Sequence, residues 1–521
     1  MSRIDGREVT AALELRCDVV IVGSGPAGSA AAAELSSHGV DVVVVEAGRW
    51  YDPSEFPVSA FDAMAEMYRG MGSTAVVGSA PMPYVQAKMV GGASPVNGAI
   101  CWRLPRDVHE SWLRNDPALG DGVPWDVLET VTDTIEQRLN VHATDPAVAG
   151  PKNLLMATGA EALGLAHEPI RRNVSGCDGL GRCMQGCPKG NKLSVDRTLL
   201  ADAMGRGTTV LSSVEVTSVL AARGRAIGVV GRSDGGAHVL VRASRAVVVA
   251  ASAVQTPALL LASGITQGPV GHHFQGHPGV SMTGRFPDPV RAWEGATQGH
   301  QVTGLRHEGI KFEALGSGID LLASRVNGVG RPLARNIEEL AHHLDWGAAI
   351  RSDAHGRVRL VRGRIVVSYE PTARDIVKFR RALRVMGEMM FAAGATEVDP
   401  AVRGYHSPVT SVAELVHLEQ HGPANPSAYL TAITHMFGTA RMGSSPEFSV
   451  VGTDFEHHNV AGLYVADSSV FPTNTGVNPQ ISIMALATLC ARRAAGLAVD
   501  TAVPVTTRTK RKRSRPQPTG A

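Results

Sequence analysis

Near its amino terminus the chain alternates apolar runs and small residues in a way typical of a strand, turn, helix and strand. The apolar run Cys17–Ile21 predicts a short strand, and the alanine-rich segment behind it predicts a helix that ends at Gly39. A second apolar run, Val40–Val45, predicts another strand, and Glu46 follows it directly. This alternation of strand and helix indicates an α/β fold.

Later segments also have clear patterns. The alternation over residues 357–371 predicts two antiparallel strands. Residues 375–394 predict an amphipathic helix, whose apolar face carries Ile376, Phe379, Leu383 and Met386. Pro479 predicts the first turn of a helix that runs to Ala495. A sheet backed by helices is therefore expected over residues 290–430.

The composition is that of a globular protein. Of 521 residues, 44% are hydrophobic and 19% are charged, which excludes a disordered chain, and the length predicts about two to four structural units. The net charge is +2, but residues 501–521 contain six Lys and Arg and no acid. The rest of the chain is mildly acidic, so nucleic-acid binding is not expected, and the basic tail is expected to be disordered.

No segment predicts export or membrane insertion. The first ten residues are polar, and the longest apolar stretch, Val247–Ile265, is interrupted by polar residues and a proline. Six cysteines are too few for a disulfide scaffold in a chain of this length. We therefore expect a cytoplasmic protein without a transmembrane segment.

Three glycines lie between the first predicted strand and its helix. Gly23, Gly25 and Gly28 form a GxGxxG motif, and Glu46 lies 18 residues beyond the last of them. Such a turn brings the backbone and the helix N-terminus to a pyrophosphate, while the acidic residue accepts hydrogen bonds from ribose hydroxyls. NAD and FAD both fit, but no second GxGxxG follows for a separate nicotinamide site, so FAD is the expected dinucleotide.

Four further segments carry a resemblance to a known family. They are VGGASPVNGAICWRLP at 90–105, VVVAASAVQTPALLLASGI at 247–265, THMFGTARMG at 434–443, and residues 462–495 with their TGVNPQ sequence. In this order the chain resembles the glucose-methanol-choline (GMC) family of flavin oxidoreductases. The resemblance implies the following division: a Rossmann-like α/β FAD-binding domain built from residues 14–110, 190–289 and 431–500, a connecting region at 111–189 with a cysteine-rich loop at 175–192, and an inserted α+β substrate-binding domain at 290–430.

The resemblance also implies an activity. This is FAD-dependent oxidation of an alcohol to a carbonyl, with proton abstraction and hydride transfer to flavin N5, and the active-site pair would be His435 and Asn478. An imidazole, whose ordinary pKa is about 6.5, suits the removal of a hydroxyl proton. An amide can hold the alcohol oxygen without competing for that proton. Other histidines are expected in loops: His457 and His458 at the surface, and His272, His273 and His277 no closer than the edge of the cofactor.

Further residues are placed against the cofactor by the resemblance. They are Gly91, Gly92, Ser94, Asn97, Gly98, Val216, Asp467, Asn478 and Pro479. The last two precede the predicted final helix, whose N-terminal dipole would stabilise negative charge on reduced flavin. Some relatives bind flavin covalently through a histidine where this chain has Val96, and because valine has no nucleophile we expect noncovalent FAD.

Three cysteines cluster in a glycine-rich loop. Cys177, Cys183 and Cys187 have the spacing C-x5-C-x3-C, and thiolates gathered in this way are ligands of iron–sulfur clusters and of zinc. The spacing is similar to that of sugar dehydrogenases of the same family, which implies a [3Fe–4S] cluster and an electron-accepting protein or quinone. A zinc site, free thiols and one disulfide remain alternatives. Cys17, Cys101 and Cys490 are expected in the core.

Electron acceptor and substrate stay open at this point. The leading expectation is a dehydrogenase that passes electrons to an acceptor other than dioxygen. An alcohol oxidase that releases hydrogen peroxide is one alternative, and an FAD-containing lyase that does no redox chemistry is another. The expected substrate is a small-molecule alcohol, with a steroid, a long-chain alcohol, a sugar and a glycoside all compatible with the residues.

Overall fold

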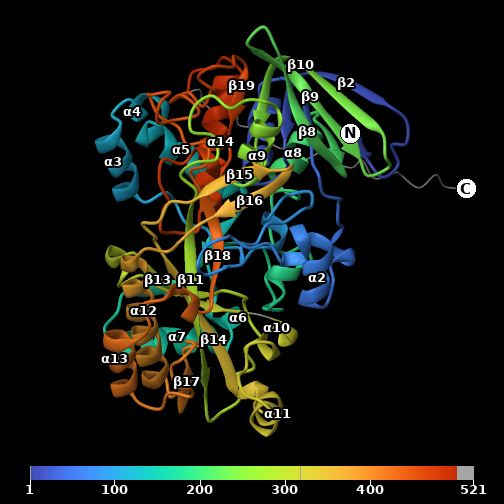
Figure 1. Ribbon diagram of the computed structural model, residues 1–521. Helices are drawn as coiled ribbons and strands as arrows, with labels where there is room; N and C mark the ends of the chain where they lie inside the picture. The colour runs from blue at the N-terminus through green and yellow to red at the C-terminus, as the bar shows by residue number, and fades with distance from the viewer. Residues whose placement is uncertain (1, 317, 501–521) are drawn as a thin grey trace, which may run out of the picture.

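The computed structural model describes residues 2–316 and 318–500, which contain two large β-sheets (Figure 1). The strands of the first sheet are β1 (Ser2–Asp5), β2 (Leu13–Val22), β3 (Val42–Val45), β7 (Thr209–Ser212), β8 (Val214–Ala222), β9 (Arg225–Ser233), β10 (His238–Val249) and β19 (Leu463–Val465). Their order is β1-β7-β3-β2-β10-β9-β8, with β19 beside β10. The tail at 501–521, expected to be disordered, lies outside the described residues.

The centre of the first sheet is parallel and covered by helices. β2 pairs in parallel with both β3 and β10, and the whole of β3 is buried. Helix α1 (Pro26–Ser37) packs against α14 (Gln480–Ala494) and α8 (Leu199–Gly205). Continuous apolar strands suit such a covered parallel sheet. The predicted strand, turn, helix and strand are therefore confirmed, and Pro479 directly precedes α14.

The second sheet is antiparallel. Its strands are β5 (His167–Pro169), β11 (Gln275–Arg285), β12 (His300–Val302), β13 (Ile310–Leu315), β14 (His343–Ile350), β17 (Glu397–Asp399) and β18 (Thr431–Phe437). Helices α7 (Pro151–Ala162) and α12 (Ala373–Ala392) pack on it, and α13 (Val412–His421) packs on α12. The predicted helix is confirmed, and the four apolar residues predicted on its face are buried.

The predicted pair of strands forms a hairpin apart from that sheet. β15 (Arg357–Val361) and β16 (Arg364–Ser368) pair with each other as a two-stranded sheet. Figure 1 shows this hairpin between the two large sheets. β4 (Val141–Ala143) and β6 (Arg171–Asn173) form another two-stranded sheet.

The chain passes from one large sheet to the other several times. β5 enters the second sheet before β7–β10 return to the first, and β11–β18 precede β19. β11 and β18 come from segments assigned above to the FAD-binding domain, and in the structure they pair in the second sheet. The domain boundaries themselves stay a prediction.

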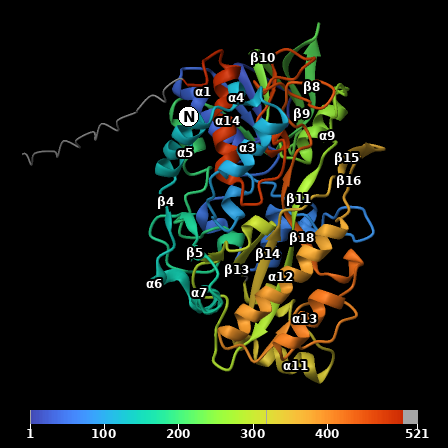
Figure 2. The ribbon, with the colours of Figure 1, turned by 90° about the vertical axis from the view of Figure 1, so that its left-hand side faces the viewer.

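The other helices fill the sides of the molecule. They are α2 (Ala60–Met67), α3 (Arg106–Asn115), α4 (Leu119–Gly122), α5 (Trp125–Arg138), α6 (Pro146–Ala149), α9 (Gln255–Ala262), α10 (Ile319–Ala323) and α11 (Arg331–Glu338). Figure 2 shows α1, α5 and α14 at the first sheet and α12 and α13 at the second. Over residues 2–316 and 318–500, no helix is both long and apolar enough to cross a bilayer.

Candidate active site

The glycine-rich turn between β2 and α1 leaves no room for a side chain at Gly23 or at Gly28. A Cβ on Gly28 would lie 1.9 Å from the carbonyl oxygen of Gly23. Gly23 itself has a φ of +99°, a backbone conformation that favours glycine. The carboxylate of Glu46 braces this turn: one oxygen accepts from the N–H and hydroxyl of Ser24 at 2.9 and 2.8 Å, and the other accepts from the N–H of Gly48 at 2.8 Å. Glu46 therefore has a structural task beside the ribose contact expected of it.

A cavity of about 1030 Å³ runs from this turn to the predicted active-site pair. Its size is at the upper end of the range for ligand pockets, about 300–1,000 Å³, so a dinucleotide and a small substrate can share it. The following predicted residues line it: Gly23, Gly25, Glu46, Gly92, Asn97, Gly98, Val216, His435, Asp467, Asn478 and Pro479. These residues fit an extended dinucleotide with its phosphates at the helix N-terminus.

The loop at residues 90–98, which the family resemblance places against the flavin, packs directly on the backbone of the glycine-rich turn. A Cβ on Gly92 would lie 2.7 Å from Cα of Gly25, and the N–H of Gly91 donates to the Ser24 hydroxyl at 3.0 Å. Ser94 is fully buried and its hydroxyl accepts from the N–H of Val195 at 3.2 Å. Gly28, Gly91 and Ser94 do not line the cavity; they hold the two loops that do.

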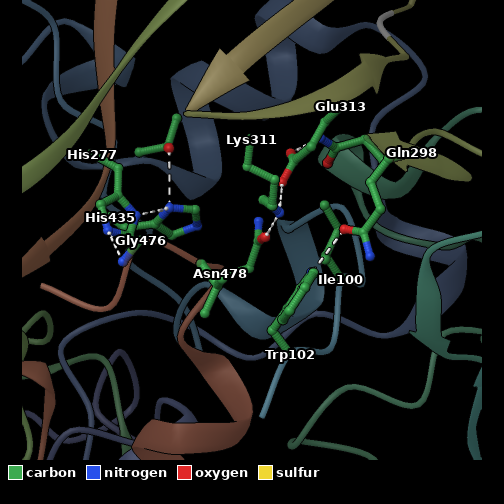
Figure 3. Close-up of polar contacts among 12 residues, drawn as sticks. Ile100, Trp102, His277, Gln298, Lys311, Glu313, His435, Gly476 and Asn478 are labelled. Atoms are coloured by element: carbon green, nitrogen blue, oxygen red, sulfur yellow. Dashed lines mark hydrogen bonds and ion pairs between the residues drawn. The ribbon is translucent and has the colours of Figure 1, made fainter. Parts of the chain in front are cut away.

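His435 lies on β18 and meets a second histidine that the sequence analysis placed in a loop. His277 is on the neighbouring strand β11, is 1% exposed, and has its Nδ1 3.2 Å from Nδ1 of His435 (Figure 3). The expectation for His277 was therefore wrong, whereas His272 and His273 do lie in the loop before β11. The antiparallel pairing of β11 with β18, across 158 residues of sequence, brings the two rings together.

The hydrogen-bond pattern assigns the hydrogens of the two rings. The N–H of Gly476 donates to Nε2 of His277 at 2.9 Å, so a neutral His277 carries its hydrogen on Nδ1 and donates it to His435. A neutral His435 then accepts at Nδ1 and carries its own hydrogen on Nε2. In this resting arrangement Nε2 of His435 is a hydrogen-bond donor.

Asn478 is held by a buried ion pair that the sequence analysis did not identify. Nζ of Lys311 donates to Oδ1 of Asn478 at 2.5 Å and forms an ion pair with Glu313 (Figure 3). Lys311 is 1% exposed, and Gln298 donates to the other carboxylate oxygen of Glu313 at 2.8 Å. Because Oδ1 accepts from the ammonium, the NH₂ group of Asn478 is the part of the amide that can donate, to Glu313 or to a ligand in the cavity.

Burial and charge set the protonation of these groups. Burial lowers the pKa of His435 to about 4 and holds that of His277 well below its usual range, so both rings are neutral at pH 7. Burial opposes ionisation of Glu313, yet the Lys311 ammonium keeps the pKa of the carboxyl below its ordinary value. The site thus combines a neutral histidine pair with an ion pair.

Two other histidines were expected at the surface. His457 is 2% exposed, and its Nδ1 accepts from the N–H of Asn459 at 3.1 Å, so the expectation of a surface residue was wrong. Its neighbour His458 is half-buried and bonds to the Ser449 hydroxyl. Neither lines the cavity.

The cysteine-rich loop does not fit an iron–sulfur cluster. Over the part of the chain that the structure describes, no three Cys, His, Asp or Glu side chains are grouped so that they could hold a metal ion. The guanidinium of Arg172 instead contacts Sγ of Cys177 at 3.6 Å and Sγ of Cys183 at 3.2 Å, so a cation already faces these sulfurs. The predicted [3Fe–4S] cluster is therefore not supported, and neither is a zinc site. Cys17, Cys101 and Cys490 are buried, as predicted.

Comparisons with known proteins agree with the fold. The GMC oxidoreductase family matches in two models, over residues 64–279 and 352–487, and an NAD(P)-binding Rossmann-like domain matches residues 21–50. Among solved structures, a formate oxidase from Aspergillus oryzae has a TM-score of 0.72 at 17% identity, covering 93% of this chain and 99% of that one. A pyridoxine 4-oxidase from Mesorbium loti has a TM-score of 0.66 at 19% identity, covering 91% and 98%.

Curated relatives extend along most of the chain. An uncharacterized GMC-type oxidoreductase of Mycobacterium tuberculosis is 36% identical over 475 residues, which are 91% of this chain and 75% of that protein. A long-chain-alcohol oxidase of Arabidopsis thaliana is 27% identical over 91% of this chain and 67% of its own length. With two family models over most of its length and a relative above 30% identity, the chain belongs to the GMC oxidoreductase family.

Proposed function

We propose that the protein is an FAD-dependent enzyme that oxidises an alcohol to a carbonyl compound. One observation carries the proposal: a single cavity joins the glycine-rich turn to His435 and Asn478. FAD, when bound, supplies the acceptor for the hydride. The glycines of the turn and of the loop at 90–98 would hold it, with Glu46 and Val216 toward the adenosine end and Asp467 along the chain of the cofactor.

The two proposed catalytic residues divide the work on the substrate oxygen. Lys311 donates to Oδ1 of Asn478 and so fixes the orientation of the amide. The NH₂ group of Asn478 then donates to the substrate oxygen and fixes its position. His435 takes the hydroxyl proton at Nε2.

His435 must first change its tautomer, because the resting ring carries a hydrogen on Nε2. In this change His435 gives up its Nε2 hydrogen to solvent in the cavity, and the hydrogen between the rings moves to Nδ1 of His435. Nε2 of His277 takes up a hydrogen in exchange, at the expense of the bond from Gly476, about 1–3 kcal/mol. Asn474 is the proposed acceptor of that hydrogen, because its Oδ1 is buried without a hydrogen-bond partner among the described residues and its side chain favours the protonated form of the His277 ring. The histidine pair therefore has two tautomeric states, and in the second of them Nε2 of His435 can accept the substrate proton.

The neutral pair gives a prediction for the pH dependence. Because burial lowers the pKa of His435 to about 4, the ring stays unprotonated well below its usual value of 6.5. The rate of flavin reduction is expected to hold from pH 7 to about 5 and to fall as the pH drops through about 4. Anaerobic reduction rates over a buffer series, with bound FAD measured at each pH, test this. A midpoint near 6.5 in fully loaded enzyme would contradict it.

The flavin loop predicts noncovalent FAD. Val96 is 2% exposed and aliphatic, so it offers no bond to the cofactor. Acid precipitation is expected to release all flavin into the supernatant, as measured by its absorbance. Yellow colour that stays with the precipitated protein would show a covalent link.

The cavity favours an alcohol with an apolar body. Beyond His435 the wall is largely apolar, with Val280, Leu315, Leu321 and Leu430 among its side chains. Anaerobic mixing of the holoenzyme with a long-chain alkanol, a sterol and glucose tests the proposal. Bleaching of the flavin by at least one alcohol is expected, with the alkanol fastest. If none of a broad alcohol panel bleaches fully bound FAD, the redox proposal fails in favour of a non-redox lyase.

The electron acceptor is proposed to be a molecule other than dioxygen. The oxidase alternative has its own support, since the relatives include proteins named long-chain-alcohol oxidases. The two are separated by peroxide release during aerobic turnover, measured against reoxidation by a quinone. Stoichiometric peroxide would identify an oxidase.

A further inference from the structure

A second, small cavity lies outside the cofactor site, at the cysteine-rich loop. It has a volume of about 30 Å³ and is lined by Arg172 and by all three clustered cysteines. Arg172 is 1% exposed, and its Nε has no hydrogen-bond partner among the described residues. The two terminal nitrogens of this guanidinium each meet a sulfur: Nη1 meets Cys177 and Nη2 meets Cys183.

The surroundings of this cavity hold more positive than negative charge. Lys152 and Lys192 are 0% and 2% exposed, and Nζ of each donates to main-chain carbonyls only. In the described part of the chain, neither lysine nor Arg172 forms an ion pair with a carboxylate. Buried charge without a counter-ion is unfavourable, and burial lowers the pKa of both lysines to about 8.

Asp178 lines the same cavity but pairs with Lys189, so the thiols are the groups that can place negative charge directly against Arg172. Burial opposes ionisation of Cys183, but Arg172 and Lys192 hold the pKa of this thiol below its ordinary value. Cys177 and Cys183 are half-buried residues that line the small cavity, which gives a small oxidant a route to them. Their sulfurs contact the two terminal nitrogens of one guanidinium, and both residues line the same small cavity.

We propose that Cys183 is a peroxide-reactive thiolate whose oxidation forms a disulfide with Cys177. The thiolate attacks one oxygen of hydrogen peroxide, the O–O bond breaks, and a sulfenic acid and hydroxide form. Cys177, as thiolate, then attacks the Cys183 sulfur and displaces a second hydroxide. Each hydroxide takes up a thiol proton, so two thiols and one peroxide give one disulfide and two waters.

The site is connected to the cofactor cavity. Nζ of Lys192 donates to the carbonyl of Cys183 at 2.9 Å and to that of Asn97, in the flavin loop, at 2.8 Å. The Tyr68 hydroxyl likewise contacts the carbonyls of Met184 and Val96 at 2.8 and 3.1 Å. A disulfide in the cysteine loop therefore acts on the loop that lines the cofactor cavity, and oxidation is expected to slow turnover reversibly.

Alkylation of the full-length holoenzyme tests the thiolate. With limiting iodoacetamide at pH 7 and peptide mass spectrometry, Cys183 is expected to react at least about ten-fold faster than Cys187, which lies in the same loop without a contact to Arg172. Arg172→Met should slow Cys183 by about ten-fold or more, and Arg172→Lys by less. Equal rates for Cys183 and Cys187 in the parent chain overturn the proposal, even if the Arg172 variants do not fold.

Stoichiometric hydrogen peroxide tests the disulfide. A Cys177–Cys183 cross-linked peptide is expected, reversed by dithiothreitol. In Cys177→Ser the reaction should stop at a sulfenic acid on Cys183 that dimedone traps, whereas Cys187→Ser should form the cross-link as the parent does. Iron or zinc bound to the purified protein, with all three thiols unreactive, would overturn the proposal, and so would a cross-link that always includes Cys187.

Discussion

Replacing His435 with alanine is expected to slow reduction of the bound flavin by about 10²–10⁴-fold, the usual loss when a proton acceptor is removed. The ring is half-buried in the wall of the main cavity, where it is the histidine that a bound alcohol can reach. Stopped-flow absorbance under anaerobic conditions, with one alcohol at saturating concentration, measures the effect.

Two controls belong to this experiment. The variant should keep its full complement of FAD, because the ring is at the end of the cavity away from the glycine-rich turn. His307→Ala removes an exposed histidine, 75% exposed at its side chain, and should leave the rate unchanged. A near-normal rate in His435→Ala would contradict the assignment of the proton acceptor.

Replacing Lys311 with methionine is expected to lower the free energy of unfolding by about 3–5 kcal/mol, because it leaves the Glu313 carboxylate buried without its partner. The same change removes the hydrogen bond that orients Asn478. It should also raise the pKa of His435, since a nearby cation is lost while the carboxylate stays. Denaturant unfolding of the holoenzyme and the acid limb of the pH–rate profile measure the two effects.

The double variant Lys311→Met with Glu313→Gln is the matched control. It removes both charges at similar side-chain volume, so it is expected to recover about half or more of the lost stability. If the double variant is as unstable as Lys311→Met alone, packing around the lysine and not the unpaired charge explains the loss.

The parts of the site that could be predicted lie close together in sequence. The GxGxxG turn and Glu46 form one local unit, whose strand and helix pattern is visible in 30 residues. His435 and Asn478 were identified by family resemblance, and both line the cavity. In each case a short segment carries enough pattern to indicate its place.

The parts that could not be predicted depend on strand register. Nothing local to His277 shows that β11 will pair with β18 so that its ring meets His435. Lys311 and Glu313 alternate with apolar residues on β13, a pattern equally typical of a strand with one face in water. Arg172 precedes the cysteine loop, so the spacing of the cysteines alone suggested a metal and gave no sign of the guanidinium that faces them.

The repeated passage of the chain between the two large sheets limits how the molecule can be divided into fragments. Neither sheet is made from one continuous stretch, because β5 is inserted ahead of β7 and β19 completes the first sheet only after β18. A continuous fragment cut to contain one sheet alone would lack a strand of that sheet, β19 of the first or β5 of the second. A truncation or a proteolytic cut within the part of the chain that forms either sheet is therefore expected to abolish cofactor binding and substrate binding together. The two sheets cannot be exchanged with those of other proteins as independent domains.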